Sequence, residues 1–487
     1  MSSKPVKRFC SELRIENHTV VGIRGDPSDI HSVVVPQGVL RIGNYAFEEC
    51  LQLTSVTLPK SLTHVGEWAF SDCSGLTSVN FPIKLTAIGD RAFFNCKTLT
   101  SVTLPESLTH LGEQAFCNCF GLTSVTFPIE FPTGGDGAFC YFFMCRGLTS
   151  VTLPESLTHL GENALGFCLS LTSVTLPESL THIGENALQN CVGLTSVTFP
   201  NKLTTIGKGA FGGCNTLTSL TLPESLTHLG ESAFEFCSGL TSVIFPNKLT
   251  TVGNGAFSHC TRLTSVTLPD SLTHLGESAF AYCFDLTSVT FPNKVGDGAF
   301  FNCNRLTSVT LPEILTRLRQ SAFKCCTSLT SVAFPNKLTT VGKGAFRGCK
   351  RLTSLTLPES VTHLGESAFY NCAGLTSVTL PDALTHIDKC VFSECETLTS
   401  VVFRPPVSRG AFIVWAAGNS RHRDNWQLTT VKQLRNVLRL ITMFAMWSRD
   451  VDSVDPDGRN RVFEGCTNLG GVKKYEYDDS YMGWQLL

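Results

Sequence analysis

The segment Leu99–Gly121 reads LTSVTLPESLTHLGEQAFCNCFG, and copies of it fill most of the chain. Thirteen of the fifteen intervals between successive copies are 23 residues. The copies begin with LTSV or a close variant at Leu53, Leu76, Leu99, Leu122, Leu148, Leu171, Leu194, Leu217, Leu240, Leu263, Leu286, Leu306, Leu329, Leu352, Leu375 and Leu398. A degenerate copy from Ile30 makes seventeen repeats. A fixed period of this length predicts one solenoid instead of the three domains that 487 residues would otherwise suggest.

The start of each repeat predicts a short β-strand with one buried face. In the repeat from Leu53, Val56 and Leu58 alternate with polar residues, which is the period-2 pattern of a strand. Pro59 ends the strand because proline has no N–H to donate to a sheet. The chain then reaches Gly66, where we expect a tight bend.

The end of most repeats carries the pattern xAFxxC. Ala69, Phe70 and Cys73 have a spacing compatible with one short helical turn. Some seven or eight apolar side chains per repeat cannot form a core alone, but stacked repeats bury them continuously. The excess of phenylalanine, 34 residues, is then explained by an aromatic spine. We expect this spine to include Phe70, Phe93, Phe116, Phe139, Phe211 and Phe234.

Two repeats differ in length. The repeat from Leu122 gains three residues around CYFFMC, which we place between Phe139 and Cys145. The repeat from Leu286 loses three residues after Lys294. Connecting turns tolerate such changes better than inward-facing positions do.

Composition limits the classes of partner and of cysteine chemistry. The chain has 38 basic and 40 acidic residues, and its formal charge of −2 argues against a nucleic-acid partner. Sixteen of the 22 cysteines fall at one repeat position, from Cys50 to Cys395. We expect a column of buried free thiols that act as small apolar groups, with disulfides between adjacent repeats as the alternative. No cysteine pair has zinc-finger spacing, and we expect no cofactor.

Histidines and charged residues also recur at single repeat positions. The histidines are His64, His110, His159, His182, His228, His274, His363 and His386. Most are on alternate repeats, roughly 10 Å apart, which favours turn residues copied by duplication over a metal site. At another position, acidic and basic residues alternate and should attract their neighbours. These residues are Glu185, Lys208 and Glu231, and later Lys343, Glu366 and Lys389.

The exposed side of the predicted strand is the candidate binding face. It carries serine at the third position of each repeat and threonine at the fifth position of most. The candidate residues are Ser55, Thr57, Ser101, Thr103, Ser124, Thr126, Ser150, Thr152, Ser173, Thr175, Ser196, Thr198, Ser219 and Thr221. A flat array of hydroxyl groups is similar to that of ice-binding solenoids, but strand propensity and solubility also explain it.

The N-terminal residues 1–29 form the expected cap of the solenoid. Residues 12–25 predict a short hairpin that covers the apolar end and strand edge of the first repeat. The sequence MSSKPVKRFC at the start lacks the apolar segment of a secretory signal. No run of 18 apolar residues predicts a membrane span. We therefore expect an intracellular, soluble and cytoplasmic protein.

The C-terminal residues 413–487 depart from the repeat. Apolar residues at helical spacing predict an amphipathic helix over 428–447 within a basic segment. This helix either covers the last repeat or binds an anionic membrane or a partner. Residues 453–464 are near a calcium-loop pattern, but 462–469 fit the AFxxCxxL step of a residual repeat fragment, and we favour that fragment.

The repeats over residues 30–412 resemble the BspA-like leucine-rich repeats, also called type 5. The resemblance rests on segments such as LTSVTLPESLTHLGE and implies a right-handed solenoid with a parallel sheet along one face. Members of this family include microbial surface proteins and adhesins that bind other proteins. The family supplies no catalytic residues, and residues 413–461 lie outside its pattern.

We expect a β-rich solenoid with a C-terminal α-helical segment and a non-enzymatic role in binding a protein partner through the sheet face. No phosphate-binding loop, nucleophile elbow or HExxH motif is present. Because hot spots are seldom serine or threonine, specificity should come from irregular positions. These are Tyr141, Phe142, Phe143 and Ile244. We further expect a monomer; the alternatives are a cell-surface or secreted adhesin, an ice- or polysaccharide-binding protein, and membrane association through 428–447.

Overall fold

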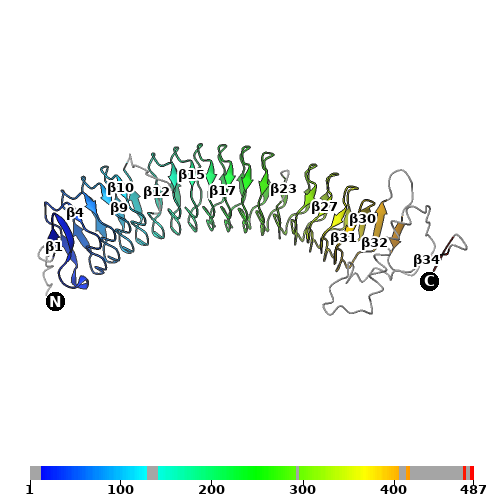
Figure 1. Cartoon of the computed structure of the whole chain (residues 1–487), viewed down its shortest axis with the longest axis horizontal. Helices are drawn as coiled ribbons and strands as arrows, with labels where there is room; N and C mark the ends of the chain where they lie inside the picture. Colours follow the sequence, from blue (N-terminus) through cyan, green and yellow to red (C-terminus); the bar gives the residue numbers. More distant parts are fainter. Residues whose placement is uncertain are drawn as a thin grey trace. The chain divides into compact units, whose positions relative to one another are not determined.

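The computed structural model describes residues 13–128, 141–291, 296–404, 413–416, 475–478 and 483–486. The chain divides into two compact bodies, residues 1–280 and residues 281–487, called the N-terminal and C-terminal bodies below. Each body is a stack of repeats, and each repeat carries up to two short strands that pair in parallel with their equivalents in adjacent repeats (Figure 1). The predicted β-solenoid is confirmed.

The first series of strands carries the Ser-Val-Thr sequence. In the N-terminal body it comprises β3 Ser32–Val34, β5 Ser55–Thr57, β7 Ser78–Val79, β9 Ser101–Thr103, β11 Ser124–Thr126, β12 Ser150–Thr152, β14 Ser173–Thr175, β17 Ser219–Thr221, β19 Ser242–Ile244 and β21 Ser265–Thr267. In the C-terminal body it comprises β23 Ser288–Thr290, β24 Ser308–Thr310, β26 Ser331–Ala333, β28 Ser354–Thr356, β30 Ser377–Pro381 and β32 Ser400–Arg404.

A second series of two-residue strands was not predicted. In the N-terminal body it comprises β4 Arg41–Ile42, β6 His64–Val65, β8 Ala87–Ile88, β10 His110–Leu111, β13 His159–Leu160, β15 His182–Ile183, β16 Thr205–Ile206, β18 His228–Leu229, β20 Thr251–Val252 and β22 His274–Leu275. In the C-terminal body it comprises β25 Arg317–Leu318, β27 Thr340–Val341, β29 His363–Leu364 and β31 His386–Ile387. These strands are too short to show a period-2 pattern, so the sequence indicated only a turn.

A hairpin lies against the first repeat. Strands β1 Leu13–Glu16 and β2 Thr19–Ile23 pair antiparallel, and β2 then pairs in parallel with β4. The 3-10 helix η1 Pro27–Asp29 follows, with Asp26 as its N-cap. The hairpin thus covers the strand edge that the second series would otherwise expose.

The AFxxC segment is not the helical turn that we expected. Its N–H groups alternate between two kinds of acceptor. Phe47 N–H donates to the carbonyl oxygen of Ala69 in the next repeat, at 2.8 Å, and Glu49 N–H donates to Ser71 in the same way, at 2.9 Å. Between them, Glu48 N–H donates to Tyr45 in its own repeat. A helix would direct these donors to its own i−4 carbonyls, so pairing between repeats excludes it.

This alternation requires left-handed backbone at two positions in most repeats. In the first AFxxC segment, Tyr45 and Glu49 both have φ of 59°. Asparagine, which tolerates this region, occupies the second position at Asn95, Asn190 and Asn371. The sequence signal for these turns is therefore the recurrence of asparagine or glycine just before the cysteine.

The glycine after the second strand serves a close approach between repeats and not the bend that we expected. A Cβ on Gly66 would lie 2.7 Å from the backbone nitrogen of Asn44 in the preceding repeat. Gly230 is equally close to the backbone of Gly207 and Lys208, at 2.5 and 2.6 Å. Arg319 and Asp388 replace this glycine in the C-terminal body, and Asp388 N–H still donates to the carbonyl of Leu364 at 2.9 Å. The stack therefore accommodates a side chain in these two repeats.

Phenylalanine forms the core of both bodies, as predicted, with one correction. In the N-terminal body Phe47, Phe70, Phe93 and Phe116 stack with ring centroids 5.0 to 5.2 Å apart. Phe142 continues this column at 5.6 Å from Phe116, so the assignment of Phe139 to the spine is wrong. The extra residues therefore precede the phenylalanine position and do not follow it.

The cysteine column is buried throughout. All sixteen cysteines at this position are free thiols with little or no exposed surface. Most of these thiols donate to the phenylalanine or leucine carbonyl of the preceding repeat, as in Cys73 to Phe47 at 3.1 Å and Cys326 to Phe300 at 3.2 Å. Burial raises the pKa of Cys191, Cys237 and Cys372 to about 12. These thiols fill the core and stay protonated at neutral pH.

The predicted attraction between alternating charges is confirmed at two places. Lys208 Nζ lies 3.8 Å from Glu231 Oε1 in the N-terminal body. In the C-terminal body Glu366 lies 2.9 Å from Lys343 and 3.6 Å from Lys389. The hydrogen bond from Lys343 is the main reason that the pKa of Glu366 is lowered. Because these side chains are largely exposed, each pair contributes little to stability.

The chain beyond residue 404 is described only in part. Strand β33 Ile413–Ala416 pairs antiparallel with β32, and β34 Tyr475–Asp478 pairs antiparallel with β35 Gly483–Leu486. The predicted helix 428–447 and the repeat fragment 462–469 lie outside the described residues.

We expect the aromatic column to dominate stability. Phe234 has no exposed surface and stacks between Phe211 and Phe257. Phe234→Ala should destabilise the chain by about 3–5 kcal/mol. Phe234→Leu should cost less than about 1.5 kcal/mol, because Leu165 and Leu188 already occupy this position. The midpoints of urea unfolding, followed by circular dichroism, measure both; equal losses would contradict the stacking account.

Candidate functional site

The predicted serine and threonine residues form two aligned columns, here called the Ser/Thr face. In β9 and β11, Ser101 pairs with Ser124 and Thr103 with Thr126, while the valine between them is buried. The same exposed–buried–exposed pattern holds in β5, β12, β14 and β17. Ser196 and Thr198 are also exposed, although no strand forms there. All fourteen candidate residues therefore face solvent.

The hydroxyl groups of the Ser/Thr face are available for binding. Within the described residues, no hydrogen bond engages the side chains of the fourteen candidates. The threonine one residue before the serine is different, because in most repeats its hydroxyl is used within the stack. Thr77 Oγ1 donates to the carbonyl of Thr54 at 3.2 Å, and Thr123 Oγ1 donates to Thr100 at 3.0 Å. The second position of the repeat thus holds the stack together while the third and fifth positions stay open.

Only one of the four predicted specificity positions lies on this face. Ile244 replaces threonine beside Thr221 and is 62% exposed. Phe142 is fully buried in the aromatic column, and Tyr141 occupies the alanine position with 4% of its surface exposed. The prediction that these two residues contact a partner is wrong, because both side chains are buried in the core. We had placed the three extra residues after the phenylalanine position, whereas they precede it. Phe143 is half-buried and packs edge-on against Phe167. Both belong to AFxxC segments, and the side of each body that these segments form is called the turn side below.

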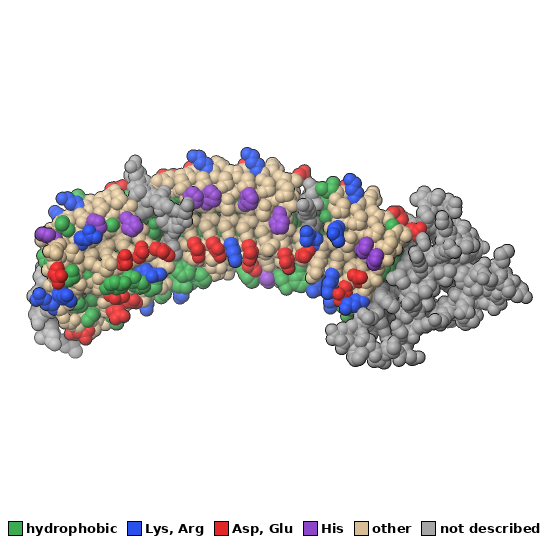
Figure 2. Space-filling view, in the orientation of Figure 1, with side chains coloured by type: hydrophobic (Ala, Val, Ile, Leu, Met, Phe, Trp, Pro, Cys, Tyr) green, Lys and Arg blue, Asp and Glu red, His purple; other side chains and the backbone are tan. Residues whose placement is uncertain are grey.

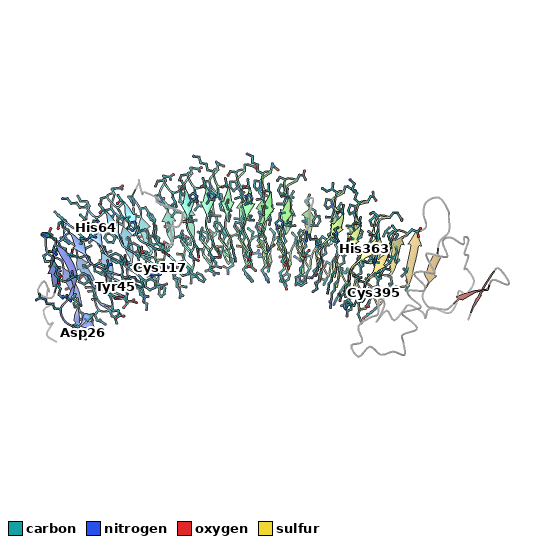
Figure 3. All side chains as sticks on the ribbon, in the orientation of Figure 1. Asp26, Tyr45, His64, Cys117, His363 and Cys395 are labelled. Carbon is teal, nitrogen blue, oxygen red and sulfur yellow. The ribbon has the colours of Figure 1, made fainter. Side chains whose placement is uncertain are left out.

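The histidine column lies within the second strand series, where each histidine is the first residue of its strand (Figure 3 labels His64 and His363). Two pairs of these histidines lie on adjacent repeats, and the rings of each pair stack face to face. The ring centroids of His159 and His182 are 4.6 Å apart, and those of His363 and His386 are 4.4 Å apart. Acidic side chains and histidines each form a row along the visible face of the N-terminal body (Figure 2).

Hydrogen bonds define the tautomer of His182. Thr181 Oγ1 donates its single proton to the carbonyl of Thr158, at 3.0 Å. Its contact with His182 Nδ1, at 2.8 Å, must then be a bond that the imidazole donates. The proton of the neutral ring is on Nδ1, and Nε2 is left as an acceptor. Within the described residues no group of three or more histidine, cysteine or acidic side chains could hold a metal ion.

The stacked pair makes stability depend on pH. Burial, followed by the charge of His159, lowers the pKa of His182. The unfolded chain therefore binds this proton more readily than the folded chain, and stability falls as pH decreases below about 6.5. We expect the melting temperature to drop less between pH 7.5 and 5.5 in His182→Gln than in the wild type. His228→Gln, whose neighbours are Thr205 and Thr251, should keep the full wild-type drop.

Some exposed apolar residues were missed by sequence reasoning. Ile83 is 83% exposed at the turn after its strand, and Phe236 is 53% exposed on the turn side, where it stacks on His259 at 4.4 Å. Each departs from the residue most common at its position, as Ile244 does. A search for such departures alone would have found them.

Comparison with known proteins identifies the repeats. The family model of the BspA type leucine rich repeat region (6 copies) matches residues 26–142, 139–238, 181–297 and 293–410. The chain belongs to the BspA-type leucine-rich repeat family. The resemblance in the LTSVTLPESLTHLGE segments is therefore confirmed. A comparison with curated proteins finds none that matches this BspA-type chain.

Solved structures of leucine-rich repeat proteins are similar to this BspA-type chain. A leucine-rich repeat protein from Bacteroides ovatus is 28% identical, with a TM-score of 0.55 over 81% of this chain and 93% of its own. A leucine rich cell surface protein from Faecalibacterium prausnitzii is 21% identical, with a TM-score of 0.36 over 84% and 97%. The T. pallidum leucine rich repeat protein is 27% identical, with a TM-score of 0.26 over 42% and 77%. Across the described part of the chain, no helix is long and apolar enough to cross a membrane.

Proposed function

We propose that this BspA-type chain is a non-enzymatic scaffold that binds a partner protein through its Ser/Thr face. The observation that carries the proposal is the register of the first strand series. Parallel pairing brings equivalent exposed hydroxyls side by side on successive repeats, as in Ser150 with Ser173 and Thr152 with Thr175. Such a face offers many weak polar contacts along one direction.

Exposed irregular side chains supply the contacts that discriminate between partners. Ile244 interrupts the threonine column with an apolar side chain that is 62% exposed. Ala333 interrupts the corresponding column in the C-terminal body beside Thr310. An apolar anchor surrounded by hydroxyl groups matches the arrangement of hot spots within a polar rim. We assign the main binding contact in the N-terminal body to the surroundings of Ile244.

The distribution of ionisable groups supports a role without catalysis. A catalytic site needs different groups that converge on one point. Here the histidines recur in one column, the acidic residues alternate with lysines in another, and the thiols are buried. Repetition thus spreads each kind of side chain along the stack.

We propose an intracellular partner, with the cell surface as the alternative location. Labelling of intact cells with an impermeant biotin reagent distinguishes the two locations.

Site-specific crosslinking tests the binding face. A photoreactive phenylalanine analogue at position 244 should crosslink a partner in cells of the source organism, and the same analogue at exposed Asn215 on the turn side should not. Thr221→Arg should reduce the crosslinked product from position 244 at least tenfold, because arginine would stand beside Ile244. Asn215→Arg adds the same charge away from the face and should leave the product unchanged. Equal crosslinking from both positions would show that the Ser/Thr face is not the site.

A further inference from the structure

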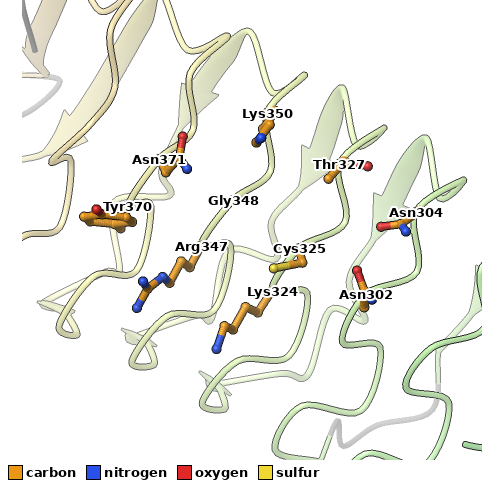
Figure 4. A pocket seen from close by; sticks show the side chains of 10 residues that line it. All are labelled: Asn302, Asn304, Lys324, Cys325, Thr327, Arg347, Gly348, Lys350, Tyr370 and Asn371. Carbon is orange, nitrogen blue, oxygen red and sulfur yellow. The ribbon is translucent and has the colours of Figure 1, made fainter. Parts of the chain in front are cut away.

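The turn side of the C-terminal body contains an open groove of about 510 Å³, here called the basic groove (Figure 4). Residues of three repeat positions line it, each recurring every 23 residues. One wall carries Lys324, Arg347 and Tyr370, and the other carries Asn304, Thr327 and Lys350. The floor consists of Asn302, Cys325, Gly348 and Asn371.

Backbone hydrogen bonds fix the floor against the first wall. Asn302 N–H donates to the carbonyl of Lys324 at 2.7 Å, and Cys325 N–H donates to the carbonyl of Arg347 at 2.7 Å. Gly348 N–H continues the series to Tyr370 at 2.8 Å. The groove therefore runs along the stack across four repeats, which is roughly 14 Å at ~4.8 Å per repeat.

The groove is cationic, and its cations are not neutralised. Arg347 lies over the ring of Tyr370 at 4.6 Å, and Lys324 lies over the ring of Phe301 at 5.2 Å. These rings position the side chains without removing their charge. No carboxylate lines the groove, and within the described residues neither these two side chains nor Lys350 forms an ion pair. The equivalent turns of the first repeats have the opposite character, with Glu48, Glu49 and Asp72.

We propose that the basic groove binds an acidic peptide segment in extended conformation. The groove spans four repeats, and its length equals that of about four extended peptide residues at ~3.4 Å each. Lysine and arginine on opposite walls can pair with acidic side chains. The carboxamides of Asn302 and Asn371 each offer a donor and an acceptor, which match the C=O and N–H of a peptide unit. An inorganic oxyanion presents acceptors alone and would leave the amide oxygens unpaired.

This site is separate from the proposed function, because it lies on the turn side and not on the Ser/Thr face. Its test uses purified full-length chain and a defined peptide. A negative result in the groove test therefore does not contradict partner binding at the Ser/Thr face. A negative result in the crosslinking test does not contradict peptide binding in the groove.

The floor of the groove contains a cysteine, Cys325, whose rate of alkylation reports whether the groove is occupied. Cys325 is half-buried, whereas the sixteen cysteines of the column are buried. Glycine at 348 leaves its thiol open, since a Cβ there would lie 3.6 Å from Cys325 Sγ. Cys390 is half-buried in the same body but does not line the groove. A peptide in the groove covers the first of these thiols and not the second.

Alkylation of the full-length chain tests occupancy. A decaglutamate peptide at low salt should slow the reaction of Cys325 with iodoacetamide at least fivefold and leave Cys390 unchanged, as read by peptide mass mapping. Added salt should remove the protection, because exposed charges are screened. Absence of protection at millimolar peptide, or equal protection of both thiols, would overturn the proposal. Stronger protection by a heparin hexasaccharide than by the peptide would overturn the assignment of a peptide ligand.

Variants test the geometry. Arg347→Gln and Lys350→Gln should each weaken binding of fluorescent decaglutamate about two- to fivefold. Gly348→Asn fills the floor with the residue found at this position in the following repeat, Asn371, and should abolish measurable binding. Lys97→Gln is the matched control, because Lys97 follows its cysteine as Lys350 does but lies in the N-terminal body. Unchanged affinity in Gly348→Asn, or an equal loss in Lys97→Gln, would refute the groove.

Discussion

Hydrogen bonding between repeats is the constraint on which the rest of this structure depends. A 23-residue repeat has too few apolar side chains to close its own core, so its backbone polar groups must pair with those of its neighbours. This pairing occurs at the two strand series and at the AFxxC turn, where Phe47 and Glu49 donate to the following repeat. Gly66 is one of the glycines at which the backbones of adjacent repeats approach closely. The stacked phenylalanines and buried thiols fill the space that results.

The same constraint arranges the exposed side chains in columns. When repeats stack in register, every exposed position becomes a column, and the chemistry of one repeat extends along the body. The hydroxyls of the Ser/Thr face, the stacked histidines and the alternating charges are three such columns. We propose that recognition uses positions where a column is interrupted, as at Ile244, or where the residues of several columns differ from the other repeats, as in the basic groove.

Sequence reasoning succeeded where one residue type recurred at one position. The period, the strand at Val56, the buried cysteines and the exposed serines followed from repetition and alternation. It failed where backbone conformation decided the outcome. Ala69, Phe70 and Cys73 have helical spacing, yet the left-handed residues beside them direct the amides to other repeats. The insertion near Phe142 was misplaced because two phenylalanines, at 139 and 142, both fitted the local pattern, and only stacking on Phe116 distinguishes them.

The amino-acid sequence was sufficient to establish a stack of BspA-type repeats. The 23-residue period is visible when successive segments are compared, and the period-2 pattern of the strand is visible within a single segment. It also identified the residues of the Ser/Thr face. The tertiary structure was needed for what depends on distances between repeats. These include the second strand series, the tautomer of His182, the burial of Tyr141 and Phe142, and the basic groove. The lining residues of the groove are spread over residues 302–371 and meet only when backbone hydrogen bonds bring successive repeats into contact.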